Sequence, residues 1–364
     1  MSCSDVTDIP SPAEQKDRAS TGRPLPANES SYQPQLSETF SAATASDQEI
    51  PRHSLKPGIY VPTLAFFNKE SEALDVDTIA KHAVRMAEAG VAGILTQGTN
   101  GEAAHLSRTE RKVVTKTTRD ALNDAGYTDL PIVVGCGAQS TRESIEICYE
   151  AQSSGGDFAI ILPPSYYKEQ YRREELRQFF TDIADASPIP ILLYNYPAVA
   201  AGIDLDSDMI VDLAQHPNIV GCKLTCGNTG KLNRIAAGTR AATPHDPASG
   251  FLCLGGSADF TLQALIGGGS GAICGLANVT PKACVRLYDL YRTGEMEEAR
   301  RLQAAVARGD WIVIQSGIMG TKSLLQHFLG YGGFARKPLP RPTLQETVSN
   351  NENLQELMNI EMRL

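Results

Sequence analysis

The chain has 364 residues, of which 42% are hydrophobic and 21% charged, and its formal net charge is −9. This length and apolar fraction fit a globular protein with a sizeable core, arranged as one large domain or two medium ones. No block rich in lysine and arginine stands out, and no apolar run reaches the ~18 residues of a membrane span, so nucleic acid and membranes are disfavoured as partners.

Residues 1–55 are predicted to be a disordered N-terminal extension. They are rich in Ser, Thr, Pro, Gln and Ala, contain few aromatic residues and show no periodic apolar pattern. The acidic residues Asp5, Asp8, Glu14 and Asp17 disfavour a mitochondrial transit peptide, which is usually rich in arginine and poor in acids. The segment also lacks the apolar centre of a secretory signal peptide. The sequence therefore predicts a cytoplasmic protein.

From residue 58 onward, short apolar runs alternate with amphipathic helical stretches. The runs are almost continuously apolar, which is typical of parallel strands buried on both faces. Eight predicted strands lie at 58–67, 92–98, 131–137, 158–164, 190–197, 219–225, 250–257 and 271–278. Helical patterns lie between them, for example at 76–89, 107–125, 140–154, 172–186, 206–215 and 258–267.

Eight strand–helix units of about 30 residues each predict an α/β fold, a closed (β/α)₈ TIM barrel over residues 56–280. A doubly wound nucleotide-binding sheet would need a glycine-rich turn after the first strand, whereas residues 68–72 read Asn-Lys-Glu-Ser-Glu. Residues 281–343 are predicted to form a small C-terminal helical appendage. Residues 344–364 are predicted to be a tail that either forms a further helix or frays.

Lys223 is the strongest single candidate for chemistry, because the active sites of such barrels lie at the C-terminal ends of the strands. It stands late in the sixth run among apolar residues. There it points either into the barrel mouth or outward beneath a helix, and in both places the loss of water disfavours an ammonium form. An uncharged amine is the nucleophile of a Schiff-base enzyme. The alternative is a buried stem whose charged end reaches water.

Polar residues end other runs on the same side of the predicted barrel. Tyr194 ends the fifth run, where a phenolic hydroxyl either transfers protons or simply packs. Residues 98–102, Gly-Thr-Asn-Gly-Glu, follow the second run as a tight loop that either holds a carboxylate or merely turns the chain. Tyr166 and Tyr167 follow the fourth run, where paired tyrosines otherwise serve as packing residues. Their joint placement with Lys223 favours an active site.

A metal-dependent mechanism would need histidines or carboxylates with ligand geometry at the mouth. The six histidines form no close pair, and His105, just past the 98–102 loop, has no evident partner. The sequence therefore favours a reaction with no metal and no cofactor. Cys222 and Cys226 flank Lys223 without the spacing of a zinc site, which favours reduced core thiols over a redox role.

These motifs, in this order and spacing, resemble the dihydrodipicolinate synthase / N-acetylneuraminate lyase family of class I pyruvate-dependent aldolases. The resemblance covers roughly residues 57–340. It implies a (β/α)₈ barrel with extra C-terminal helices, assembled as a homotetramer of two tight dimers. The motifs that carry it are Gly-Thr-Asn-Gly-Glu at 98–102, Pro-Pro-Ser-Tyr-Tyr at 163–167, Tyr-Asn-Tyr-Pro at 194–197, Gly-Cys-Lys at 221–223 and Gly-Gly-Ser at 255–257.

The resemblance implies four catalytic residues. Lys223 corresponds to the Schiff-base lysine, and Tyr194 corresponds to the tyrosine over the imine. Thr99 corresponds to a hydroxyl that relays protons, and Tyr167 corresponds to the tyrosine that completes this relay from a neighbouring subunit. All four follow from matching the motifs residue by residue.

The resemblance also implies substrate-binding residues. Asn100 stands where the family often has Thr or Ser, and with Gly101 it would bind the substrate carboxylate. Thr225 lies two residues after the lysine, so it faces the same side of the strand and would touch the substrate. Gly255, at the end of the seventh run, is a further expected substrate-binding position.

The sequence departs from dihydrodipicolinate synthase itself, which has an arginine where residues 198–202 read Ala-Val-Ala-Ala-Gly. Residues 214–223, 277–279 and 330–333 are as similar to 4-hydroxy-2-oxoglutarate aldolases as to fungal 2-keto-3-deoxy-L-galactonate aldolases, and residues 222–233 favour the second group. The implied activity is cleavage of a 2-keto-3-deoxy sugar acid to pyruvate and an aldehyde in carbohydrate catabolism. A synthase-like condensation and a non-catalytic sugar-acid sensor remain alternatives, as do flavin-dependent and phosphosugar enzymes.

Overall fold

The structure is a computed structural model that describes residues 53–341 and 351–364. The predicted disorder of residues 1–55 falls almost wholly outside the described residues, and so does the first part of the predicted tail. Within the described ranges, no helix combines the length and the apolar character needed to cross a membrane.

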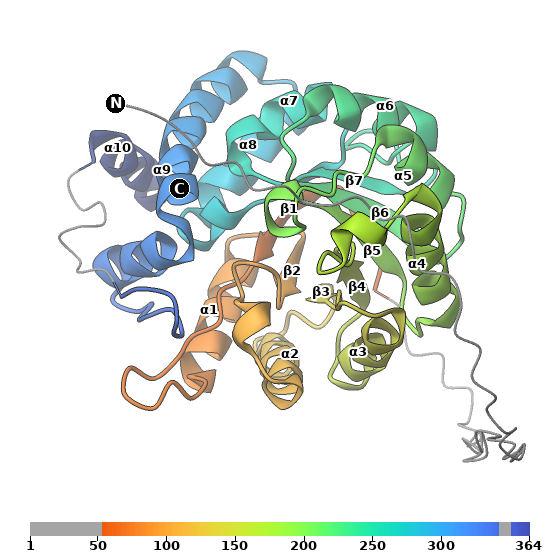
Figure 1. The fold of residues 1–364 in the computed structure, drawn as a ribbon. Helices are drawn as coiled ribbons and strands as arrows, with labels where there is room; N and C mark the ends of the chain where they lie inside the picture. Colours follow the sequence, from red (N-terminus) through yellow and green to blue (C-terminus); the bar gives the residue numbers. More distant parts are fainter. Residues whose placement is uncertain (1–52, 342–350) are drawn as a thin grey trace, which may run out of the picture. The chain divides into compact units, whose positions relative to one another are not determined.

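Eight parallel strands close into a barrel in chain order, and β8 completes the ring by pairing with β1 (Figure 1). This confirms the predicted (β/α)₈ barrel. Each strand lies inside one of the eight apolar runs, which are longer than the strands because buried residues continue into the following loops. The strands are β1 (Gly58–Pro62), β2 (Gly93–Thr96), β3 (Ile132–Gly135), β4 (Phe158–Ile161), β5 (Ile191–Asn195), β6 (Ile219–Leu224), β7 (Leu252–Gly255) and β8 (Gly271–Ile273).

A ring of helices surrounds the strands (Figure 1). Local sequence sets where they start: at α2, Ser107 Oγ accepts the N–H of Glu110 while the Glu110 carboxylate accepts the N–H of Ser107. The helices are α1 (Val76–Glu88), α2 (Arg108–Asp124), α3 (Thr141–Ser153), α4 (Arg173–Ala186), α5 (Ser207–Leu213), α6 (Thr229–Thr239), α7 (Thr261–Ile266) and α8 (Pro281–Arg292). Short 3₁₀ helices are η1 (Ala103–His105), η2 (Lys168–Gln170), η3 (Pro197–Val199), η4 (Ala258–Phe260) and η5 (Gly275–Asn278).

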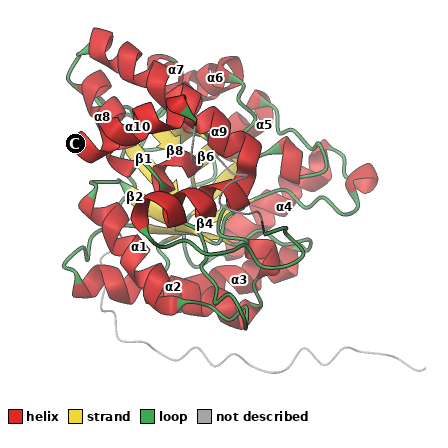
Figure 2. Ribbon diagram, turned by 90° about the vertical axis from the view of Figure 1, so that its left-hand side faces the viewer, coloured by secondary structure: helices red, strands yellow, loops and turns green. Residues whose placement is uncertain are grey.

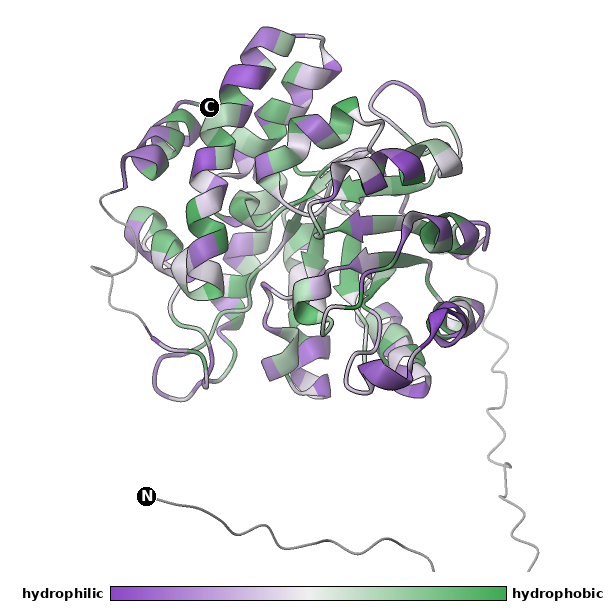
Figure 3. Cartoon of the chain, turned by 45° about the horizontal axis from the view of Figure 1, so that its top comes forward, coloured by the Kyte–Doolittle hydropathy of each residue, from purple (hydrophilic) through white to green (hydrophobic). Residues whose placement is uncertain are grey.

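The core has two layers, because successive side chains of a strand point to opposite faces of the barrel wall. The outer layer packs strands against helices, and Figure 3 shows mostly hydrophobic strands beneath helices that carry both hydrophobic and hydrophilic residues. The inner layer fills the barrel. Its members are Tyr60, Leu95, Val133, Phe158, Ile160, Leu192, Tyr194, Ala242, Leu252, Leu254 and Ile273.

The C-terminal part of the chain adds helices on one side of the barrel. Helices α9 (Met296–Leu329) and α10 (Glu352–Arg363) pack against α8, as Figure 2 shows. Gly317 interrupts α9 with a left-handed φ of 61°. The Glu361 carboxylate of α10 accepts the N–H groups of Lys282 and Ala283, so it satisfies the first turn of α8.

Candidate active site

Lys223 points into the barrel. It pairs in register with Tyr194 of β5 and with Leu254 of β7, and both of these side chains belong to the inner core layer. The direction is set by a bulge: Ile191 pairs with Ile219 but the next residue, Leu192, pairs with Gly221, so β6 has one extra residue before the lysine. Bulges of this kind often re-aim a side chain beside an active site.

The amine of Lys223 has no charged partner among the residues that the structure describes. The side chain is only 4% exposed, and its Nζ lies 4.2 Å from the centroid of the Tyr194 ring. No residue of 53–341 or 351–364 forms an ion pair or hydrogen bond with this amine. The Tyr194 ring in turn stacks on Tyr196, with 6.0 Å between centroids. A buried, unpaired amine over an aromatic ring is therefore the centre of the candidate site.

Thr225 and the end of β7 form one wall next to the lysine. The Oγ1 atom of Thr225 is buried and has no hydrogen-bond partner among the described residues. A Cβ built on Gly256 would lie 2.2 Å from this oxygen, so only glycine fits opposite Thr225. A Cβ on Gly255 would instead meet Phe260 and Ala264, on the outer side of the barrel wall. The Cβ position of Gly256 thus faces Thr225, whereas that of Gly255 points away from it.

The loop of residues 98–102 follows β2 at the same end of the barrel. The Glu102 N–H donates to the Thr99 carbonyl oxygen at 3.1 Å, which closes a tight turn. A Cβ on Gly101 would lie 3.0 Å from the Thr63 carbonyl oxygen, and the Asn100 side chain lies over Gly275. The Thr99 hydroxyl makes no hydrogen bond within the described chain. Within the described residues, none of these side chains forms a hydrogen bond with Lys223 or Tyr194.

Tyr167 lies on the surface. It is 62% exposed, and its ring packs edge-on against Tyr166, which is 78% exposed, at 5.0 Å between centroids. The loop that carries both rings is held by Gln139, whose side-chain oxygen accepts the N–H groups of Ser165 and Tyr166 at 2.9 Å each. The structure therefore does not bring Tyr167 together with Lys223 within one subunit.

Buried polar residues that sequence reasoning did not single out hold two of the mouth loops. After β7, Oδ2 of Asp310 accepts the Ser257 hydroxyl at 2.6 Å and the N–H groups of Ala258 and Asp259 at 2.8 and 2.9 Å. Burial raises the pKa of Asp310 to about 6. Its only sequence signal is an acidic residue inside a helix, which usually marks an exposed face.

The loop after β5 is held in a similar way. Asn195, the last residue of β5, donates from Nδ2 to the Asp204 carboxylate at 2.7 Å and accepts the Leu205 N–H at 2.9 Å. Lys231 of α6 forms an ion pair with Asp204 and donates to the Leu205 carbonyl oxygen at 2.8 Å. Asn195 lies within the quoted Tyr-Asn-Tyr-Pro motif, so the motif contains both a site residue and its support.

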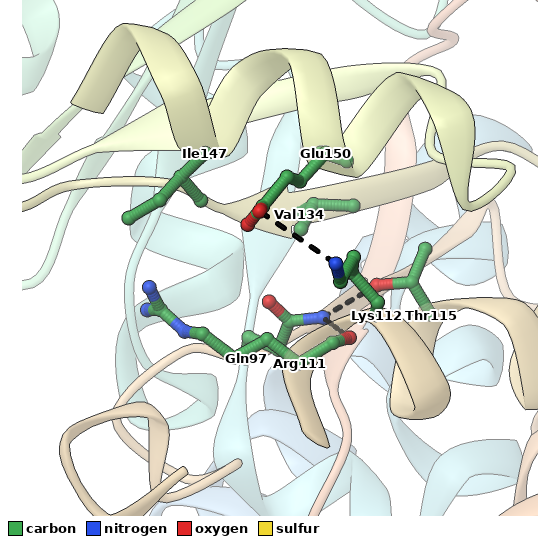
Figure 4. Close-up of a pocket in the computed structure, with 8 residues that line it drawn as sticks. Gln97, Arg111, Lys112, Thr115, Val134, Ile147 and Glu150 are labelled. Atoms are coloured by element: carbon green, nitrogen blue, oxygen red, sulfur yellow. Dashed lines mark hydrogen bonds and ion pairs between the residues drawn. The ribbon is translucent and has the colours of Figure 1, made fainter. Parts of the chain in front are cut away.

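A cavity outside the barrel wall lies between α2 and α3 (Figure 4). The Gln97 amide at the end of β2 donates to the Arg111 carbonyl oxygen and to Thr115 Oγ1, each at 2.5 Å. Lys112 and Glu150 form an ion pair across the cavity at 3.7 Å. This cavity lies on the outer side of the strands, away from Lys223. The hydrogen bonds of Gln97 beside it anchor the residue that precedes the 98–102 loop.

The described histidines and cysteines do not gather into a metal site. Within the described parts of the chain, no group of three or more His, Cys, Asp or Glu side chains is placed to hold a metal ion. His105, for which the sequence offers no partner, does have one: its Nδ1 lies 3.0 Å from Glu102 Oε2. Cys222 lies on the outer side of β6, with its sulfur 3.8 Å from that of Cys253.

Comparison with known proteins identifies the family. Residues 56–360 match the family described as Dihydrodipicolinate synthetase. A protein of Emericella nidulans named as a mitochondrial 4-hydroxy-2-oxoglutarate aldolase is 51% identical, over 85% of this chain and 97% of its own length. The L-threo-3-deoxy-hexylosonate aldolase of Hypocrea jecorina is 49% identical, over 85% and 99%.

A solved structure gives the same answer. The crystal structure of a dihydrodipicolinate synthase family protein from Coccidioides immitis superimposes with a TM-score of 0.75 at 32% identity. The match covers 86% of this chain and 99% of that one. The resemblance predicted from the motifs is confirmed, and the chain belongs to the dihydrodipicolinate synthetase family.

Proposed function

We propose that this chain is a class I aldolase that cleaves a 2-keto-3-deoxy sugar acid, such as 2-keto-3-deoxy-L-galactonate, to pyruvate and an aldehyde. The observation that carries the proposal is the amine of the buried Lys223, which has no ion-pair partner in the described part of the chain and lies over the Tyr194 ring. Nucleophilic catalysis of this kind needs an amine that is free of a proton and of a carboxylate partner.

In the proposed reaction, Lys223 Nζ attacks the C2 carbonyl of the keto acid. The carbinolamine loses water and leaves an iminium ion, which draws electrons toward C2. The backbone N–H groups of Asn100 and Gly101, together with the Asn100 side chain, bind the carboxylate, because oriented backbone N–H groups hold anions without a cationic residue. Thr225 faces the same side as the lysine and accepts or donates a hydrogen bond to the sugar-acid chain.

Bond cleavage follows from the iminium. Tyr194 accepts the proton of the C4 hydroxyl, the C3–C4 bond breaks, and its electron pair forms an enamine while the aldehyde leaves. Thr99 and a partner's Tyr167 complete the proton path to Tyr194. Protonation of the enamine at C3 and addition of water then release pyruvate and regenerate the amine of Lys223.

The substrate class rests on what the mouth lacks and on the relatives. Residues 198–202 provide no arginine to grip a second carboxylate, which disfavours a condensation like that of dihydrodipicolinate synthase. The names of the relatives divide between the sugar-acid aldolase and 4-hydroxy-2-oxoglutarate aldolase. The second activity, which yields pyruvate and glyoxylate, is therefore the alternative, and the sensor without catalysis is the non-enzymatic one.

The assembly and location are parts of the same proposal. The exposed Tyr166 and Tyr167 rings fit a surface that a neighbouring subunit covers, and the family resemblance implies a homotetramer. Sedimentation analysis at micromolar concentration is expected to give four subunits. The acidic residues before residue 20 favour the cytoplasm, whereas one relative is named as mitochondrial, and a fluorescent fusion of the whole chain distinguishes the two.

The activity is tested by a retro-aldol assay that measures pyruvate release. The expected result is a higher kcat/KM for 2-keto-3-deoxy-L-galactonate than for 4-hydroxy-2-oxoglutarate. The reverse order would establish the alternative. No pyruvate from either compound, with ligand-dependent stabilisation of the fold by the sugar acid, would favour the sensor.

A further inference from the structure

A fully buried ion pair connects the 98–102 loop to helix α9. Glu102 Oε1 lies 2.5 Å from Lys322 Nζ, and both side chains are 0% exposed. The same amine donates to the Phe334 carbonyl oxygen at 2.8 Å and lies 4.6 Å from the centroid of the Phe67 ring. Because burying two charges costs much of what their attraction returns, such a pair is weak evidence for stabilisation alone.

The second oxygen of Glu102 is held as firmly as the first. Its Oε2 atom lies 3.0 Å from His105 Nδ1 and accepts the Arg336 N–H at 2.9 Å. The Arg336 guanidinium is fixed in turn by two hydrogen bonds to the Glu110 carboxylate, at 2.6 and 3.0 Å. The carboxylate of Glu102 is thus fixed by α9, by the segment after α9 and by η1.

These contacts hold the backbone of the loop in a conformation that it would otherwise avoid. Glu102 has a φ of 50° and Gln97 a φ of 57°, so residues in left-handed conformation stand on both sides of residues 98–101. A residue with a side chain keeps this conformation only where its surroundings impose it. The two hydrogen bonds of the Gln97 side chain, on the outer side of the barrel wall, hold Gln97 in this conformation (Figure 4). The ion pair with Lys322 holds Glu102 in the same way.

We propose that Glu102 and Lys322 are positioning residues that set the geometry of the N–H groups of Asn100 and Gly101 for the carboxylate of a 2-keto acid. The inference rests on the proposed function of this loop. Neither charged group touches the substrate, because the Glu102 side chain is directed to α9. Loss of the pair weakens the binding of the keto acid and leaves the chemistry at Lys223 intact.

The test is borohydride trapping of pyruvate on Lys223 at a series of pyruvate concentrations. In Glu102→Gln and Lys322→Met, the half-saturating pyruvate concentration is expected to rise at least about tenfold, since a positioning group displaced by ~1 Å costs up to ~10²-fold. Trapping at saturating pyruvate is expected to reach the wild-type extent. His105→Ala keeps the ion pair and is less disruptive to the fold, and a rise of about threefold is expected.

The matched control is Asp157→Asn. Asp157 precedes β4 at the opposite end of the barrel and pairs with Arg119 at 2.6 Å. This variant is expected to lower the melting temperature without changing the half-saturating pyruvate concentration. If Glu102→Gln and His105→Ala also lower only the melting temperature, the inference is overturned. An unlabelled wild-type Lys223 would instead overturn the proposed function, so the two failures are distinguishable.

Discussion

Two buried lysines, at the wall beside β5 and at the junction with α9, lie in opposite surroundings. Lys322 is 0% exposed and is paired with Glu102 and the Phe334 carbonyl oxygen. Burial lowers the pKa of Lys322, and the charge of Glu102 opposes that shift. Lys223 is 4% exposed, its amine lies over the Tyr194 ring, and it forms no ion pair or hydrogen bond with the described residues. The same residue type therefore serves as a structural cation in one region and as a candidate nucleophile in the other.

The difference between the two lysines separates residues that hold loops in place from residues expected to act on the substrate. Where a buried charge is satisfied, as at Glu102, Asp310 and Lys231, its partners belong to loops that need a fixed shape. Lys223 and Thr225 have no hydrogen-bond partner among the described residues, and at these two positions the missing partner is expected to be the substrate. Changes in the first set should alter stability or binding geometry, and changes in the second set should alter turnover.

The largest effect on turnover short of losing the lysine is expected in Tyr194→Phe. Removal of the proton acceptor should lower kcat by ~10²–10⁴-fold, the usual contribution of general acid–base catalysis. Trapping of pyruvate on Lys223 should persist, because the ring under the amine remains. Tyr196→Phe, which changes the stacked neighbour, is the control and should keep most of the activity. Equal losses in both variants would argue against a proton-transfer role for Tyr194.

Stability should respond in the opposite way at the two lysines. Lys322→Met leaves the buried Glu102 carboxylate without its cation, and this is expected to cost about 3–5 kcal/mol in the free energy of unfolding. Lys223→Met removes an amine that has no ion pair, so the fold should be as stable as the wild type or more so. Urea denaturation of both variants measures the difference, and a similar loss in both would contradict the comparison.

The stability of the fold should also respond to pH through His82 of α1. This buried ring contacts the Tyr331 hydroxyl and the Asn278 side-chain oxygen at 2.9 Å each. Burial, with the nearby charge of Arg85, lowers the pKa of His82 from 6.5 to about 4. The folded state then binds fewer protons than the unfolded state, so stability is lost as pH falls from about 6.5 to about 4. At ~1.36 kcal/mol per pKa unit the loss is about 3 kcal/mol.

The measurement is the difference between wild type and His82→Gln in the free energy of unfolding, taken at pH 6.5 and pH 4. Asp310 shifts in the opposite sense, because its raised pKa makes stability fall as pH rises from 3.8 to about 6. Both proteins contain Asp310, so its contribution cancels in the difference. A difference that does not change with pH would show that His82 is not kept neutral by the fold.

The smallest effect is expected in Thr225→Val, which removes the buried hydroxyl that lacks a partner. The KM for the sugar acid should rise by up to about tenfold, the value of one hydrogen bond. The half-saturating concentration for pyruvate trapping and the free energy of unfolding should stay unchanged. A stability loss without a change in KM would show that Thr225 stabilises the fold and does not bind the substrate.

The sequence predicts the features that depend on neighbouring residues in the chain. The apolar runs predicted all eight strands, and polar residues at their ends predicted where Lys223 and Tyr194 would lie. The sequence does not decide whether Lys223 points into the barrel or outward beneath a helix, because the bulge in β6 depends on pairing with β5. The sequence predicts Gly255 as a substrate-binding position, and the structure adds that the Cβ position next to Thr225 is that of Gly256, which depends on the register with β6.

The contacts of Glu102 with Lys322 and His105 could not be predicted from the sequence, for a different reason. Glu102 and Lys322 are 220 residues apart in the chain, and nothing near Lys322 distinguishes it from a lysine on a helix surface. His105 looked unpartnered because its partner, Glu102, is three residues away in a 3₁₀ turn that the sequence did not predict. The pairing of Glu102 with Lys322 thus depends on the tertiary structure, whereas its pairing with His105 depends on a local turn.

The most direct test is reduction with borohydride in the presence of pyruvate, followed by mass spectrometry of the intact protein and its peptides. The expected result is one covalent adduct per chain, on the peptide that contains Lys223, and none in Lys223→Met. The paired Lys322 and Lys231 should stay unmodified in both proteins. A folded wild type without an adduct on Lys223 would contradict the account, and so would an adduct that persists in Lys223→Met.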